Sequence, residues 1–178
     1  MNYWKLLNTI KDYFTSDVWV KTVTEGGLAD IDLNKMNLYP LVHLEVNQST
    51  ATDNTLRYNV TLYCMDVVDM SKEETTDEFS LNDNHQQIQA IAELILLRFY
   101  LQAQHGSLFD DYFQIEVNPT LEPFTDRYTN YLAGMKLTCE IVIPLNISIC
   151  EEDLEELIFR ITQDGDFRKT EDGSFRTL

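Results

Sequence analysis

The side chains best suited to chemistry gather in one stretch, PFTDRYTNYLAGMKLTCEIVIPLN, at residues 123–146. Its first half is polar and contains Asp126, Arg127, Tyr128, Asn130 and Tyr131. A catalytic role would require a histidine or a second organised carboxylate within hydrogen-bond reach. The neighbouring sequence supplies neither, so we interpret the stretch as a structured contact loop. An ordinary surface turn is the alternative interpretation.

Phe124 is the expected anchor of this loop. Pro123 restricts the backbone before it, so we expect the ring to be held in a pocket after a rigid turn. Glu122 could form an ion pair with Arg127 and fasten the loop. We therefore predict a subunit contact made by Phe124, Asp126, Arg127, Tyr128 and Tyr131.

The three histidines do not form a metal site by their spacing. His85 and His105 lie at the two ends of one predicted helix, which at helical rise separates them by about 30 Å. His43 lies on a predicted strand. Metal sites require a specific ligand spacing that these residues lack, so we predict structural or surface roles for all three.

Acidic pairs are the remaining candidates for a divalent-metal site. None has the glycine-punctuated pattern of a calcium loop, and charged runs usually face water. We predict solvated loops for the three pairs Asp30/Asp32, Asp66/Asp69 and Asp110/Asp111. Phosphate-binding, dinucleotide and hydrolase motifs are also missing from the sequence, so we predict no metal, no cofactor and no catalytic residue.

The cysteines favour a reducing setting. Cys64, Cys139 and Cys150 are odd in number and have no CxxC spacing. Cys64 and Cys139 fall in strand-like segments, where a buried, unreactive thiol is the usual outcome. We expect an intracellular protein without a signal peptide or a membrane-spanning segment.

Charge is the strongest feature of the composition. The chain has 178 residues, 13 of them basic and 30 acidic, which gives a formal net charge of -17. Proteins that grip nucleic acid by its phosphates carry basic patches instead. The length favours one domain of ordinary size.

The order of periodic segments predicts an α+β fold. Helical spacing occurs at residues 3–14 and 84–106, and strand-like patterns at 17–24, 41–47, 56–64, 112–117 and 135–143. We predict a mostly antiparallel sheet of about five strands with two helices packed on it. We place the hairpin connection at residues 48–55 and a bulge, or the end of a strand, near Met65.

The second helix has an unusually wide apolar face. Asp83 or Asn84 is its expected cap, each with a glutamine three residues later. An inward stripe of Ile88, Ile91, Ala92, Ile95 and Phe99 is widened by Leu94, Leu97 and Leu101. Such a helix is either enclosed within the fold or contacts a neighbouring subunit.

The last segment, residues 151–178, differs in character. A short acidic helix is predicted at 151–159, followed by the near-duplicates DGDFRKT and DGSFRTL. This segment is too short and polar for a core of its own. It is either a disordered end or an arm that docks Phe167 and Phe175 on another chain.

The chain resembles the tail-completion or tail-terminator group of neck ring proteins from tailed bacteriophages, including crAss-like phages of Bacteroidetes-type hosts. The likeness rests on the order of elements, on MNLYPLVHLEV, and on a PF-x-D-R pattern with a later glycine, here Pro123, Phe124, Asp126, Arg127 and Gly134, before a strand that ends near Pro144. It covers residues 1–150.

The resemblance implies a structural virion protein without catalysis, assembled in the host bacterial cytoplasm. Such proteins form hexameric or dodecameric rings between the portal complex and the tail, with DNA passing through the lumen. The negative charge fits a channel wall that must not hold phosphates. The competing hypotheses are a monomeric acidic binding module, such as an inhibitor that mimics nucleic acid, and an enzyme with a carboxylate-bound metal.

Overall fold

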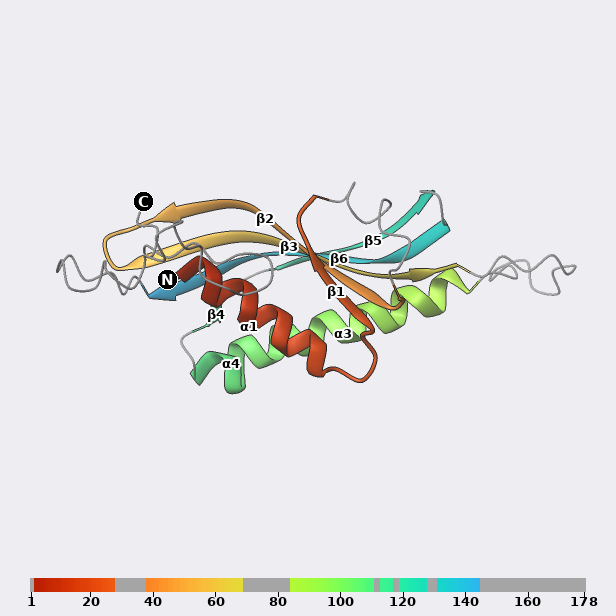
Figure 1. The fold of residues 1–178 in the computed structure, drawn as a ribbon, viewed down its shortest axis with the longest axis horizontal. Helices are drawn as coiled ribbons and strands as arrows, with labels where there is room; N and C mark the ends of the chain where they lie inside the picture. Colours follow the sequence, from red (N-terminus) through yellow and green to blue (C-terminus); the bar gives the residue numbers. More distant parts are fainter. Residues whose placement is uncertain are drawn as a thin grey trace, which may run out of the picture. The chain divides into compact units, whose positions relative to one another are not determined.

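The computed structural model describes residues 2–27, 38–68, 84–110, 113–116, 119–127 and 131–144 (Figure 1). The predicted boundary at residue 150 and the predicted helix and arm at 151–178 lie outside the described residues. The elements in chain order are α1 (Asn2–Ser16), β1 (Thr22–Glu25), β2 (Leu41–Ala51), β3 (Thr55–Val67), α3 (His85–His105), α4 (Ser107–Asp110), β4 (Gln114–Ile115), β5 (Thr120–Arg127) and β6 (Tyr131–Pro144).

The α+β prediction is confirmed. Six strands form one sheet in the order β1-β2-β3-β6-β4, and β5 also pairs with β6. Among the described strands, the β1–β2 pair is parallel and the other pairs are antiparallel. Both long helices pack on the same side of the sheet, below it in the view of Figure 1. The opposite side carries no helix among the described residues and is called the helix-free face below.

The pairing of β3 with β6 forms the centre of the sheet. It runs without a register shift from Thr55 opposite Pro144 to Val67 opposite Leu132. The predicted bulge near Met65 is therefore wrong, whereas its alternative, the end of the strand, comes two residues later at Val67. Met65 stays in register and is apolar because it is buried in a small cluster on the helix-free face. The bulge lies instead in β2, between Val46 and Gln48.

The β2–β3 hairpin is longer than the sequence pattern indicated. Residues 48–51 continue β2, although the prediction assigned them to the connection. The backbone N–H of Thr52 donates to the carbonyl of Thr55 (2.8 Å), which closes a short turn. Polar side chains are tolerated in the extended strand because this end of β2 is exposed to solvent.

The first predicted strand begins later than expected. Residues 17–21 form a turn, and β1 starts only at Thr22. The Asp17 carboxylate accepts a hydrogen bond from the Trp19 backbone N–H (2.9 Å), a local bond that competes with strand formation. Val20 is buried after this turn, whereas Val18 is 83% exposed.

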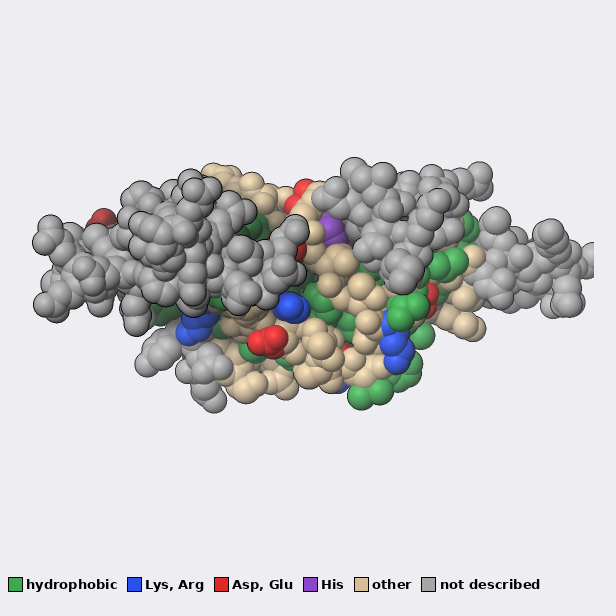
Figure 2. Space-filling view, in the orientation of Figure 1, with side chains coloured by type: hydrophobic (Ala, Val, Ile, Leu, Met, Phe, Trp, Pro, Cys, Tyr) green, Lys and Arg blue, Asp and Glu red, His purple; other side chains and the backbone are tan. Residues whose placement is uncertain are grey.

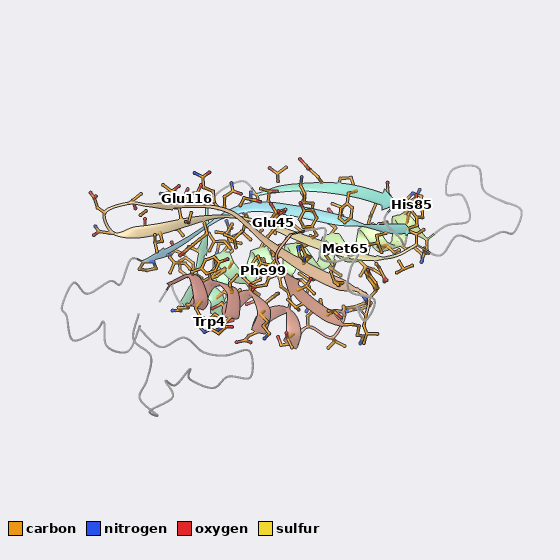
Figure 3. All side chains as sticks on the ribbon, turned by 45° about the horizontal axis from the view of Figure 1, so that its top comes forward. Trp4, Glu45, Met65, His85, Phe99 and Glu116 are labelled. Atoms are coloured by element: carbon orange, nitrogen blue, oxygen red, sulfur yellow. The ribbon has the colours of Figure 1, made fainter. Side chains whose placement is uncertain are left out.

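The main core lies between the helices and the sheet. Leu6, Ile10 and Phe14 of α1 are fully buried there, and the ring centroids of Phe14 and Phe99 are 5.1 Å apart. Phe99 also packs edge-on against Phe113, with centroids 6.2 Å apart. Figure 3 shows Phe99 between the sheet and α1, and Trp4 on the outer side of α1.

Helix α3 confirms most of its predicted inward stripe. Ile88, Ala92, Ile95 and Phe99 are buried. Ile91, however, is 37% exposed, and Leu94 and Leu101 are more than half exposed. Asn84 is the N-cap residue, but its side chain makes no capping hydrogen bond, so the predicted capping box is wrong for Asn84. Asp83 lies outside the described residues.

In the described part of the chain, no helix is long and apolar enough to cross a membrane.

Candidate subunit-contact surfaces

The predicted contact loop is largely a strand. Residues 120–127 form β5, which pairs along its whole length with β6. Pro123 fits here because β5 pairs only with β6 among the described strands, and proline is tolerated on a strand edge that donates no ladder bond. The prediction of a loop is therefore wrong for residues 123–127 and also for residues 131–134, where β6 has already begun. Polar residues interrupt the apolar alternation by which a strand is recognised in a sequence. They are tolerated here because an edge strand buries only part of its surface.

Phe124 is an anchor, as predicted, but it packs on its own chain. It contacts a cluster formed by Leu41, Met65 and Leu132 on the helix-free face, and it remains partly exposed. The Phe124 ring meets the Tyr63 ring edge-on, with centroids 5.9 Å apart. Tyr39, Tyr63 and Phe124 together are called the aromatic cluster below.

Gly134 explains how the aromatic cluster is built. Phe124 lies opposite Gly134 in the β5–β6 pair, Gly134 opposite Met65 in the β3–β6 pair, and Met65 opposite Leu41 in the β2–β3 pair. These four residues form one row across the sheet. A β-carbon built on Gly134 would collide with the carbonyl oxygen of Cys64. The glycine thus permits a close approach of β3 and β6 beneath the aromatic cluster.

The other predicted contact residues have different positions. Asp126 and Arg127 end β5 opposite Leu132 and Tyr131, but their side chains lie outside the described residues. Tyr131 is partly exposed and packs against Val68, Ile88 and Ala133. The remaining residues of the predicted set, Tyr128, Phe167 and Phe175, lie outside the described residues.

Glu122 has a partner other than the predicted Arg127. Its carboxylate lies 2.7 Å from the ammonium group of Lys136, which is directly opposite in the β5–β6 register. Facing residues on paired strands are the closest cross-strand neighbours, so this ion pair follows from the strand that the prediction missed.

The remainder of the helix-free face is polar. The Arg57 guanidinium contacts the carboxylates of Glu116 (2.6 Å) and Glu140 (2.9 Å). The hydrogen bonds that the guanidinium donates to Glu116 and Glu140 raise the pKa of Arg57 above its ordinary value. Figure 3 shows Glu116 on the side of the sheet away from α1. Two acids for one base leave this end of the face negative.

The side chains that could do chemistry are dispersed. His43 is fully buried, with Nδ1 2.8 Å from the Thr24 hydroxyl and Nε2 3.1 Å from the Gly26 carbonyl oxygen. These bonds tie β2 to β1 and to the turn after β1, so His43 has a structural role. His85 and His105 are the first and last residues of α3.

Both described cysteines are buried, as predicted. Burial raises the pKa of Cys64 and of Cys139 to about 12, so both remain protonated thiols at neutral pH. Cys150 lies outside the described residues.

Asp66 is the one member of the three acidic pairs whose side chain the structure describes. Burial raises the pKa of Asp66, and its carboxylate accepts a hydrogen bond from the Val67 backbone N–H. In the part of the chain that the structure describes, no group of three or more His, Cys, Asp or Glu could hold a metal ion. Outside that part lie Asp30, Asp32, Asp69, Asp111 and the side chain of Asp110.

Exposed apolar side chains lie in two further places, the turn after α1 and the outward side of α3. Exposed fractions are 83% for Val18, 51% for Trp19, 53% for Leu94 and 55% for Leu101. In Figure 2 hydrophobic side chains gather at the lower right of the face, over the turn that follows α1. The sequence analysis missed Val18 and Trp19 because it placed them in a strand. Asp17 could have indicated the turn, because an aspartate side chain often accepts a hydrogen bond from the backbone two residues later.

Trp19 borders a shallow pocket. The pocket has a volume of about 200 Å³ and is lined mainly by apolar side chains, including Met65, Ile88 and Ile91, with Asp66 as its acidic member. It is small for a cofactor, since pockets for drug-sized ligands are usually about 300–1,000 Å³.

No protein-family model, curated protein or solved structure matches this chain.

Proposed function

We propose that this protein is a structural subunit of a ring in the neck of a tailed bacteriophage, joining the portal complex to the tail. The proposal includes a virion location, assembly in the bacterial cytoplasm, and a lumen through which DNA passes without specific binding. It includes no catalysis. Its starting point is the resemblance in the segment from Pro123 to Pro144.

The aromatic cluster is the observation that carries the proposal. The motif residues Phe124 and Gly134 lie opposite each other on the β5–β6 hairpin, whose strand β5 pairs with no other described strand and forms an edge of the sheet. The hairpin holds the partly exposed rings of Tyr39, Tyr63 and Phe124 on the helix-free face. Aromatic residues are enriched at the centres of protein interfaces. The motif thus builds a surface suited to a neighbouring subunit.

The charge supports a channel more than a phosphate-binding protein. A subunit with net charge -17 repels DNA, which would let the duplex pass a ring without being retained. The Arg57, Glu116 and Glu140 group shows that acids outnumber bases on one end of the helix-free face as well.

The same charge favours the alternative function, an acidic protein-binding module. Such a protein would stay monomeric and would bind a basic enzyme in a one-to-one complex. The two functions therefore differ in what the chain assembles with.

The test is assembly with the portal and tail ring proteins of the same virus. Purified full-length chain is added to portal complexes, and bound particles are examined by electron microscopy and by quantitative gel analysis. We expect a ring of density with a central channel at the portal. A chain that does not associate with portal complexes, or that forms only one-to-one complexes with a basic protein, would contradict the proposal.

Arg127→Ala is the variant for this assay, with Thr125→Ala as its control on the same strand. Because Arg127 belongs to the motif that carries the resemblance, we expect Arg127→Ala to reduce assembly on the portal while its circular dichroism spectrum stays native. Thr125 is exposed and outside the motif, so its variant should assemble normally. Equal assembly of both variants would argue against a contact role for Arg127.

A further inference from the structure

The outward side of α3 carries a line of apolar residues. Ala90, Leu94, Leu97 and Leu101 follow one another at intervals of four, three and four residues. Ala90 is exposed, Leu94 and Leu101 are 53% and 55% exposed, and Leu97 is partly exposed. These four residues are called the outer stripe. Its spacing is that of the seam by which one helix packs along another.

The outer stripe is additional to the face that α3 needs for its own fold. Ile88, Ala92, Ile95 and Phe99 already bury the inward side of the helix. An amphipathic surface helix would normally carry polar residues opposite that side. Leucines retained there are suited to a partner that covers them.

The helical side of the molecule is nearly neutral in charge. Residues 2–21 and 85–105 contain four bases, Lys5, Lys11, Lys21 and Arg98, and three acids, Asp12, Asp17 and Glu93, a net charge of +1. The whole chain carries -17. Two copies of so acidic a chain repel each other over most surfaces, but they can meet here at little electrostatic cost.

The charges beside the outer stripe are complementary between two copies. Glu93 and Arg98 lie on opposite flanks of the stripe, five residues apart. In a parallel helix pair, flanking residues at this separation face each other across the seam, so Glu93 of one copy would face Arg98 of the second. Arg98 also lies 3.4 Å from the Asp17 carboxylate of its own chain, which positions the guanidinium at this flank.

We propose that the outer stripe is a self-association surface, on which α3 of a second copy of this chain packs in parallel about a two-fold axis. The contact is the same patch on both copies, so it yields a dimer. It is separate from the aromatic cluster and does not depend on the neck-ring function. Within a ring assembly it would join subunits in pairs.

Sedimentation equilibrium of the full-length chain tests the proposal. The mass should rise with concentration from 20.8 kDa towards twice that value. In Leu94→Gln/Leu101→Gln we expect the dimer Kd to rise about a hundredfold, because two leucines are lost from each copy and burial of each contributes to pairing. Glutamine suits helices and both sites are exposed, so a native circular dichroism spectrum is expected.

Two further variants distinguish this surface and its orientation. Val18→Gln makes the same kind of change at an 83% exposed residue off the helix and should leave the Kd unchanged. Glu93→Lys places like charges at both flanks of a parallel pair and should raise the Kd about tenfold. It also acts only through the flanks, so it remains informative if the double variant does not fold.

Three results would overturn the proposal. They are a wild-type mass of 20.8 kDa at every concentration, a dimer Kd that the leucine variant or Glu93→Lys leaves unchanged, and an equal effect from Val18→Gln. None of these depends on portal binding, so failure of the dimer and failure of the ring function are separate results.

Discussion

Replacement of Gly134 by alanine tests how the β5–β6 hairpin is built. Gly134 stands opposite Met65 of β3 on one side and Phe124 of β5 on the other. An added β-carbon would collide with the carbonyl oxygen of Cys64 and lie 2.9 Å from the Cα atom of Met65. Both obstructing atoms belong to the backbone of the central strand pair, so the strands must move apart.

The expected cost follows from this geometry. Forcing an extra carbon into a packed region costs about 1–3 kcal/mol. Because backbone atoms obstruct the new group, a rotamer change cannot relieve the contact, and we expect about 2–3 kcal/mol from the upper part of that range. For a chain of this size each kcal/mol lowers Tm by about 2–4 °C, so Gly134→Ala should lower Tm by about 5–10 °C.

Thermal and urea unfolding followed by circular dichroism measure this effect. Gly106→Ala is the control, since the two atoms nearest to its new β-carbon are at the end of the Gln102 side chain, which can rotate away, and the one backbone atom nearby is the Gln102 Cα atom at 2.9 Å. We expect the control to lose clearly less stability. If Gly134→Ala unfolds at the wild-type temperature and urea concentration, the close approach of β3 and β6 does not require glycine and the reasoning is refuted.

Three predictions concern charge and protonation. In a Cys150→Ser variant at pH 8, thiol reagents should modify Cys64 and Cys139 only after unfolding, because burial raises the pKa of both to about 12; rapid labelling of the native protein would contradict this. Folding raises both pKa values from 9.0, so the native state is favoured while the thiols stay protonated. This contribution to the free energy of unfolding is present below about pH 9 and is lost as the pH rises towards 12. The urea midpoint should therefore fall across that pH range. Arg57→Gln should lower the urea midpoint only slightly, and less still at high salt, because its ion pairs are solvent-exposed. A loss that is larger and independent of salt would show that burial, rather than surface charge, governs this group.

The fold class and the main core could be predicted from the sequence. The helical period of α1 and α3 and the strict alternation of β6 identify side chains that must be removed from water, and these periods depend only on local geometry. The buried residues Leu6, Ile10, Phe99, Leu137 and Ile141 follow from them. Burial of Cys64 and Cys139 was predicted in the same way.

The candidate contact surfaces could be predicted only in part. Phe124 was identified as an anchor, but its partners Leu41, Met65 and Leu132 come from three other strands. The break in alternation at Met65 was misinterpreted. The prediction assumed that only one face of the sheet is buried, whereas Met65 belongs to a second, smaller cluster on the helix-free face.

Only the tertiary structure decided which apolar residues stay exposed and which polar segments become strands. Leu94 and Leu101 have the same residue type as the buried Leu96, and their exposure depends on where the sheet and α1 lie around α3. Residues 120–127 form a strand because β6 offers a complete pairing edge, a long-range condition that no local pattern in these residues contains. The periodicity of the sequence determined the elements and their inward faces, whereas the assembly of distant strands determined the surfaces available for contact.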